Sequence, residues 1–196
     1  MKEALIAELN NLKQRDVVTR ERLLKAGRLY GFYDDEMQRV HIENAEALDH
    51  ILSIHGWPGI SMVGLEGCRT AWFVAQHSIC TPVLQRRFLR ALEKAAASGE
   101  APKKLAAFLT DRVRFNEGEP QVYGTVLDWN ERGELDCEVA EPEHIDELRA
   151  SVGLPPFAES LAQHRKEVEA EGGSAPENFK SYKEAATRWA KQVGWR

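Results

Sequence analysis

The stretch GLEGCRTAWFVAQHSI, residues 64–79, decides the fold. Its apolar residues wrap almost the whole circumference of a helix, which is typical of a helix at the centre of a protein. Gln76 and His77 lie in the last turn of this predicted helix. A polar group in such a place costs free energy unless it is paired or used. The sequence therefore predicts a buried polar site near His77.

Several segments around this stretch also space their apolar residues as helices do. The N-terminal segment, residues 2–29, has an expected interruption near Asp16. The segment 43–54 is followed by Gly56, which lies where a helix C-cap belongs. Pro82 suits the first position of the next helix. The other predicted helical segments are 34–41, 82–97, 102–115, 142–152 and 157–170.

One part of the chain has the alternation of β-strands. Residues 121–127 and 134–140 alternate apolar with polar side chains, and residues 128–133 supply a turn. The predicted fold class is therefore mainly α, a compact bundle of about six to eight helices with one β-hairpin in the C-terminal half.

The length predicts a single domain over residues 1–171. A chain of 196 residues can bury one good core and is short for two full domains. The sequence GGSAP at 172–176 is typical of a linker. The tail up to residue 196 has one weak helical stripe, and it could dock on the core or contact a protein partner through Trp189 and Trp195.

Charge and composition exclude several classes of partner. The chain has 26 Lys and Arg residues against 31 Asp and Glu, and its formal net charge of -5 argues against a nucleic-acid binder. No apolar run approaches the length of about 20 residues that spans a membrane. The three cysteines form no paired motif, so reduced thiols in a cytoplasmic protein are expected.

The polar side chains near the centre of the fold suggest acid–base chemistry. His77 is the first candidate for a base, and Asp111 for the carboxylate that fixes its tautomer and raises its basicity. Arg112 is a candidate anion clamp. His55, at a helix C-terminus, and Tyr123 are candidate hydrogen-bond or proton donors.

Each of these residues also has a plain structural interpretation. A histidine in a buried helix is more often a satisfied core group than a catalyst, and Asp111 with Arg112 also suits a solvated helix end. Trp57 is expected to fill the core. No cofactor or metal is assigned, because neither HExxH nor CxxC occurs. Were an ion bound, the ligand set to test would be His55, His77 and Asp111.

Separated motifs follow one another in a fixed order between about residues 44 and 157. They are HGWP at 55–58, QH at 76–77, LTDR at 109–112, QVYGT at 121–125 and VGLP at 152–155. In these motifs the chain resembles a bacterial family that is catalogued as a domain of unknown function. The resemblance implies no activity, but it implies that nine positions belong together: His55, Trp57, Gln76, His77, Gln85, Asp111, Arg112, Gln121 and Tyr123. Val126 departs from the glutamine that is frequent in the family, which weakens a binding role there.

Two functional hypotheses follow. In the first, the polar cluster is the pocket of an acid–base enzyme, a hydrolase or lyase, that acts on a small molecule or peptide. In the second, the same residues form a buried hydrogen-bond network in a binding or interaction module without catalytic activity. Solvent access to His77 distinguishes the two, because a pocket requires access whereas a structural network is dry and fully satisfied.

Overall fold

The computed structural model describes residues 2–28 and 33–196. Within these residues the chain is mainly helical with one two-stranded antiparallel hairpin in its C-terminal half, so the predicted fold class is confirmed. The elements are α1 (Lys2–Lys25), α2 (Asp35–His55), α3 (Ile60–His77), α4 (Pro82–Ala97), α5 (Lys103–Glu117), β1 (Asp128–Trp129), β2 (Leu135–Asp136), a 3-10 turn η1 (Pro142–His144), α6 (Ile145–Ser151), α7 (Phe157–Ala170) and α8 (Phe179–Val193).

The contacts divide the chain into two compact units, residues 1–109 (unit 1) and 110–196 (unit 2), and the division falls inside α5. Unit 2 thus groups the C-terminal tail with residues 110–171. A domain that ends near residue 171 stays a prediction. None of the described helices combines the length and the apolar character that a membrane span requires.

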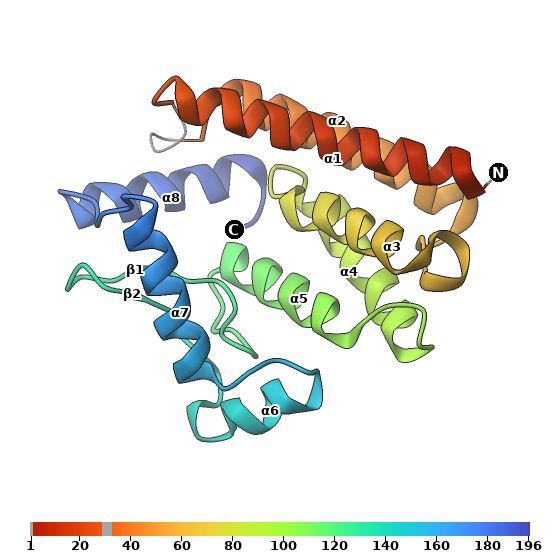
Figure 1. The fold of residues 1–196 in the computed structure, drawn as a ribbon. Helices are drawn as coiled ribbons and strands as arrows, with labels where there is room; N and C mark the ends of the chain where they lie inside the picture. The colour runs from red at the N-terminus through yellow and green to blue at the C-terminus, as the bar shows by residue number, and fades with distance from the viewer. Residues whose placement is uncertain (1, 29–32) are drawn as a thin grey trace. The chain divides into compact units, whose positions relative to one another are not determined.

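Unit 1 is built around a long antiparallel pair of helices, α1 and α2 (Figure 1). α1 and α2 both pack on α3, and α2 and α3 both pack on α4. Burial of large apolar side chains drives this packing. Large apolar side chains of unit 1 that are fully buried include Leu9, Leu23, Leu48, Val74, Phe88, Leu92 and Leu109.

α1 runs without the interruption that was expected near Asp16. Its buried residues recur every three or four positions, which is the period of one helix face. Asp16 occupies such a position, and its exposed fraction is only 1%. A polar residue inside the apolar stripe therefore does not break the helix here, because the fold supplies partners for its carboxylate. The stripe consists of Leu5, Leu9, Leu12, Asp16, Thr19 and Leu23.

α2 is one continuous helix rather than a short segment followed by a longer one. The Asp34 side chain caps its start by accepting a hydrogen bond from the backbone N–H of Glu36. Gly56 ends it with φ 74°, as predicted, and donates its N–H to the carbonyl of Leu52. His41 lies on the buried face of this helix.

α3 begins four residues earlier than predicted and bends at Gly64, which has φ 76°. Cys68 and Ala71 are fully buried, as the sequence indicated, but Leu65 is 40% exposed. The helix is therefore buried over most of its circumference rather than all of it. Its last residue is His77. α4 begins at Pro82, as predicted, and ends at Ala97.

The hairpin of unit 2 is much shorter than predicted. In the hairpin, Trp129 pairs with Leu135 and Asp128 pairs with Asp136. Residues 121–127 form a loop, and one isolated bridge pairs Gln121 with Val139. The backbone N–H groups that a strand at 122–126 needs are taken by side chains of unit 2 instead. The alternating pattern was thus a correct indication of partial burial but not of strand pairing.

The C-terminal tail contacts other residues of unit 2. The Lys183 ammonium lies 2.6 Å from the Asp128 carboxylate, and the Arg196 guanidinium donates to the Asn116 carbonyl at 3.1 Å. Trp195 is buried, with an exposed fraction of 4%. Trp195 therefore exposes little surface, and a partner contact through the tail stays a prediction.

Candidate functional site

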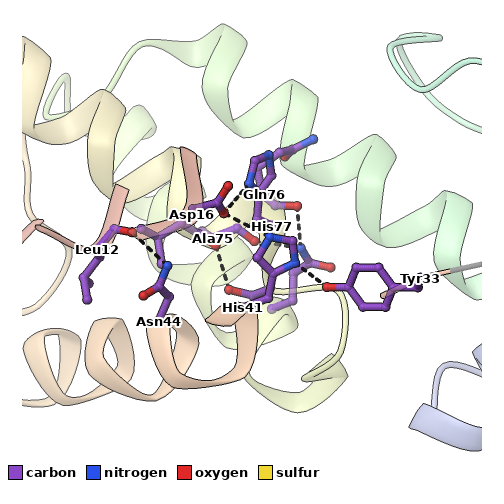
Figure 2. Close-up of polar contacts among 11 residues, drawn as sticks. Leu12, Asp16, Tyr33, His41, Asn44, Ala75, Gln76 and His77 are labelled. Carbon is purple, nitrogen blue, oxygen red and sulfur yellow. Dashed lines mark hydrogen bonds and ion pairs between the residues drawn. The ribbon is translucent and has the colours of Figure 1, made fainter. Parts of the chain in front are cut away.

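A buried carboxylate at the centre of unit 1 is shared by two histidines. Oδ2 of Asp16 on α1 lies 2.7 Å from Nδ1 of His77, at the end of α3. The same oxygen lies 3.0 Å from Nε2 of His41 on α2. Figure 2 shows the three side chains pointing toward one another from their three helices.

Asp16 is ionised in this cluster. Burial alone would raise the pKa of its carboxyl, but hydrogen bonds and favourable charge interactions with His41 and His77 outweigh burial and hold this pKa well below its usual range. An ionised oxygen only accepts hydrogen bonds. His77 therefore carries its proton on Nδ1 and donates it to Asp16.

Tyr33 contacts the other nitrogen of His41, and its hydroxyl lies at hydrogen-bond distance from Nδ1 (Figure 2). Burial, and then the nearby Cys80, raise the pKa of Tyr33 above its ordinary value, so the phenol stays protonated. The hydroxyl can then donate to Nδ1 of His41, which leaves the ring proton on Nε2, facing Asp16. Each imidazole thus directs a protonated ring nitrogen toward the same carboxylate.

The contact between His41 and Asp16 is close but poorly aligned. Although Nε2 lies 3.0 Å from the carboxylate oxygen, this buried atom has no hydrogen bond of acceptable geometry within the described part of the chain. The rings of His41 and His77 are tilted by 44°, with centroids 5.2 Å apart. One ligand atom from each of Asp16, His41 and His77 lies within 4.8 Å of the others, so these three side chains could hold a metal ion.

The cluster opens to solvent at His77. The His77 side chain is 33% exposed, against 2% for Asp16 and 9% for His41. The Phe73 ring packs on the imidazole, with centroids 4.1 Å apart. Solvent therefore reaches the His77 side chain, which a ligand-binding pocket requires and a dry structural network does not.

Gln85 and Gln76 hold the end of α3 that carries His77. The Gln85 side chain, fully buried on α4, donates from Nε2 to the carbonyls of Ala75 at 2.7 Å and Gln76 at 3.2 Å. These carbonyls belong to the last turn, where intrahelical partners are missing. Nε2 of Gln76 in turn lies 3.5 Å from the carbonyl of Phe108. Both glutamines thus help to position the helix end that carries His77.

The other predicted residues of unit 1 do not join the cluster. His55 is exposed at the end of α2. Trp57 is buried, with an exposed fraction of 8%, and belongs to the apolar core as expected. Neither residue has a described contact with His77.

Asp111 has a different role from the one predicted, because the carboxylate that contacts His77 is Asp16. Asp111 is fully buried in unit 2, and its oxygens accept the backbone N–H groups of Val122 at 2.8 Å, Tyr123 at 3.1 Å and Thr125 at 2.9 Å. They also accept the Thr125 hydroxyl at 2.9 Å. Burial raises the pKa of Asp111 in spite of these donors. This carboxylate organises a loop.

Gln121 and Arg149 complete the same loop network. Oε1 of Gln121 accepts the N–H groups of Thr125 at 3.0 Å and Val126 at 2.9 Å. The Arg149 guanidinium, 2% exposed, donates to the carbonyls of Pro155 and Tyr123 at 2.6 and 2.5 Å. The motifs around 111, 121–125 and 149–155 therefore meet in a structural network of unit 2.

Arg112, Gln121 and Tyr123 belong to unit 2, whereas the histidine cluster belongs to unit 1. Nε of Arg112 is buried without a hydrogen bond among the described residues, and burial lowers the pKa of this guanidinium. The roles of Arg112 as an anion clamp, of Gln121 in ligand binding and of Tyr123 as a hydrogen-bond or proton donor stay predictions.

A family model matches residues 4–168, which is most of the chain. Its description is a family of unknown function, DUF6624. The chain belongs to DUF6624. The match spans the three helices that carry Asp16, His41 and His77 as well as the loop network of unit 2. Neither the curated proteins nor the solved structures contain a match to this DUF6624 chain.

The sequence indicated His77 but not its partners in this DUF6624 member. Asp16 and His41 are separated from His77 by 61 and 36 residues, so no local motif joins them. The available signal was helical spacing: Asp16 continues the stripe of Leu9 and Leu12, and His41 continues that of Met37. An ionisable residue on each of two apolar stripes indicates a shared buried partner.

Proposed function

We propose that unit 1 carries an acid–base catalytic site at Asp16, His41 and His77, which hydrolyses a small molecule or peptide. One observation carries the proposal: a fully buried, ionised carboxylate is shared by two imidazoles, one of which is open to solvent. A buried charge is expensive, and perturbed titratable groups with solvent access gather at functional sites.

The geometry assigns a role to each group. Asp16 accepts the Nδ1 proton of His77 and so directs the basic lone pair of the ring to Nε2. In hydrolysis, Nε2 takes a proton from water as the water attacks, and returns it to the leaving group. The negative charge of Asp16 stabilises the imidazolium in between. His41, held by Tyr33, lies 3.0 Å from Asp16 on the other side.

The rival function is a structural network in a module without catalytic activity. Such a network keeps its members dry, as it does at Asp111 and Gln121 in unit 2, which are at most 2% exposed. The histidine cluster differs because the His77 side chain is one-third exposed. This contrast within one chain favours catalysis at the histidine cluster.

A panel of chromogenic substrates tests the proposal. We expect the wild-type protein to hydrolyse at least one of p-nitrophenyl acetate, p-nitrophenyl phosphate, bis-p-nitrophenyl phosphate and leucine p-nitroanilide. His77→Gln is expected to slow that reaction by ~10² to 10⁴-fold, the usual contribution of a general base. The matched control is His55→Gln, which changes an exposed histidine of the same unit and should leave the rate unchanged.

Circular dichroism checks that both variants are folded. Absence of hydrolysis across the panel, or equal rates for wild type and His77→Gln, would count against the catalytic function.

A further inference from the structure

We propose that Asp16, His41 and His77 bind one divalent transition-metal ion, with Zn²⁺ as the representative of the class. The inference deepens the proposed function and rests on it for its chemistry, although binding itself does not require that reaction. When bound, such an ion would lower the pKa of a water that it holds and so supply a hydroxide nucleophile near neutral pH, with the proton released to solvent. His77 would then act as a ligand and no longer as the base.

The spacing of the ligand atoms suits an ion. Zinc lies about 2.0–2.2 Å from imidazole nitrogens and carboxylate oxygens, so neighbouring ligand atoms are roughly 3.0–3.4 Å apart. Oδ2 of Asp16 already lies 2.7 Å from Nδ1 of His77 and 3.0 Å from Nε2 of His41. The two distances to the Asp16 oxygen therefore differ from this spacing by a few tenths of an ångström at most, and all three ligand atoms lie within 4.8 Å of one another.

The poor alignment at His41 points to a common centre. Nε2 lies near the carboxylate oxygen, yet this buried nitrogen makes no hydrogen bond of acceptable geometry within the described residues. Ligands of one ion aim at the ion and not at each other, so close but misaligned donor atoms are what such a site produces. An ion would satisfy a nitrogen that otherwise costs about 1–3 kcal/mol to leave buried and unbonded.

The surroundings of His41 also match those of a metal ligand. A histidine that ligates through one ring nitrogen is usually held at the other by a hydrogen bond. The Tyr33 hydroxyl occupies this place at Nδ1 (Figure 2). With an ion at Nε2, the ring proton moves to Nδ1 and is donated to the Tyr33 oxygen, so the hydrogen bond is kept with its direction reversed.

The donor set selects the class of ion. Two imidazoles and one carboxylate favour zinc and related first-row ions over magnesium or calcium, which prefer oxygen ligands only. Imidazoles ligate an ion in the neutral form, so a divalent ion together with the Asp16 carboxylate leaves a net charge of +1. Three protein ligands leave a coordination position open, as in catalytic rather than structural zinc sites. Solvent reaches the cluster at His77.

Zinc titration of chelator-treated full-length protein tests the proposal by calorimetry. We expect one Zn²⁺ per chain, with an affinity at least ~100-fold weaker in Asp16→Asn and His41→Gln. His55→Gln is the matched control and should bind as the wild type does. No saturable binding to the wild type, or unchanged affinity in both ligand variants, would overturn the proposal.

A second measurement uses only the wild-type protein, in case the variants fail to fold. Addition of Co²⁺ should produce visible absorption bands of a site with nitrogen ligands, and Zn²⁺ should remove them. Absence of these bands at saturating Co²⁺ would also overturn the proposal.

Hydrolysis measured with and without Zn²⁺ separates the two proposals. Zinc binding at the three residues without any hydrolysis supports the metal site and contradicts the catalytic function. Hydrolysis by chelated protein that fails to bind zinc supports His77 as the base and contradicts the metal site.

Discussion

Asp111→Ala should lower the free energy of unfolding of unit 2 by about 3–5 kcal/mol, because several donors in one loop lose their shared acceptor. The substitution removes the acceptor of the Val122 and Tyr123 N–H groups in a partly buried loop, whereas the N–H of Thr125 keeps Gln121 as an acceptor. Each unsatisfied buried donor costs about 1–3 kcal/mol, less what solvent can recover. Urea unfolding followed by circular dichroism measures the change.

Two further variants show how much of this stability loss comes from single interactions of Asp111. Thr125→Val removes only the hydroxyl donor to Asp111 and should cost about 1 kcal/mol. Asp111→Asn keeps the shape but turns one acceptor into a donor, so its cost should lie between the other two. A loss below about 1 kcal/mol for Asp111→Ala would contradict the role assigned to this carboxylate.

Asp16→Ala is the second substitution with a large expected effect, about 3–5 kcal/mol on the stability of unit 1 near neutral pH. It removes the acceptor shared by His77 and His41 and leaves a gap in the stripe of α1. Asp16→Asn fills the same volume and isolates the loss of charge. Urea unfolding of the three proteins at one pH gives both contributions.

The pH dependence has a definite sign. The pKa of Asp16 lies well below its usual range in the folded protein, so on acidification the unfolded chain takes up a proton first. The stability from this group is fully present above an unfolded pKa of about 4 and is lost as pH falls below it. The difference between wild type and Asp16→Asn should therefore be largest above about pH 5 and narrow by about pH 3. A difference that grows on acidification would contradict this assignment.

Local signals in the sequence accounted for the helices but not for how distant side chains meet. Pro82 and Gly56 mark helix ends through their own backbone chemistry, and the structure has both where they were expected. The expected break at Asp16 was wrong because the partners of this buried carboxylate, His41 and His77, come from two other helices. Residues 121–127 alternate as a strand does, yet Asp111 and Gln121 take the N–H groups that strand pairing needs.

The sequence predicted one member of the candidate site, His77, but not its carboxylate partner, because that partner is distant in the sequence. His77 could be selected because it ends a helix of mostly apolar residues. The choice of Asp111 as its partner rested on a neighbouring apolar run, which does not distinguish one buried carboxylate from another. Only packing decides that the stripe of α1 brings Asp16 to His77 while Asp111 organises a loop of unit 2.

The most direct test of the central claim, that His77 and His41 share Asp16, is the tautomer of each imidazole in metal-free protein. Long-range ¹H–¹⁵N NMR reports it, and His77→Gln and His41→Gln assign the two signals among the six histidines. We expect the proton on Nδ1 of His77 and on Nε2 of His41, since these atoms face the carboxylate. A neutral His77 with its proton on Nε2 would contradict the account.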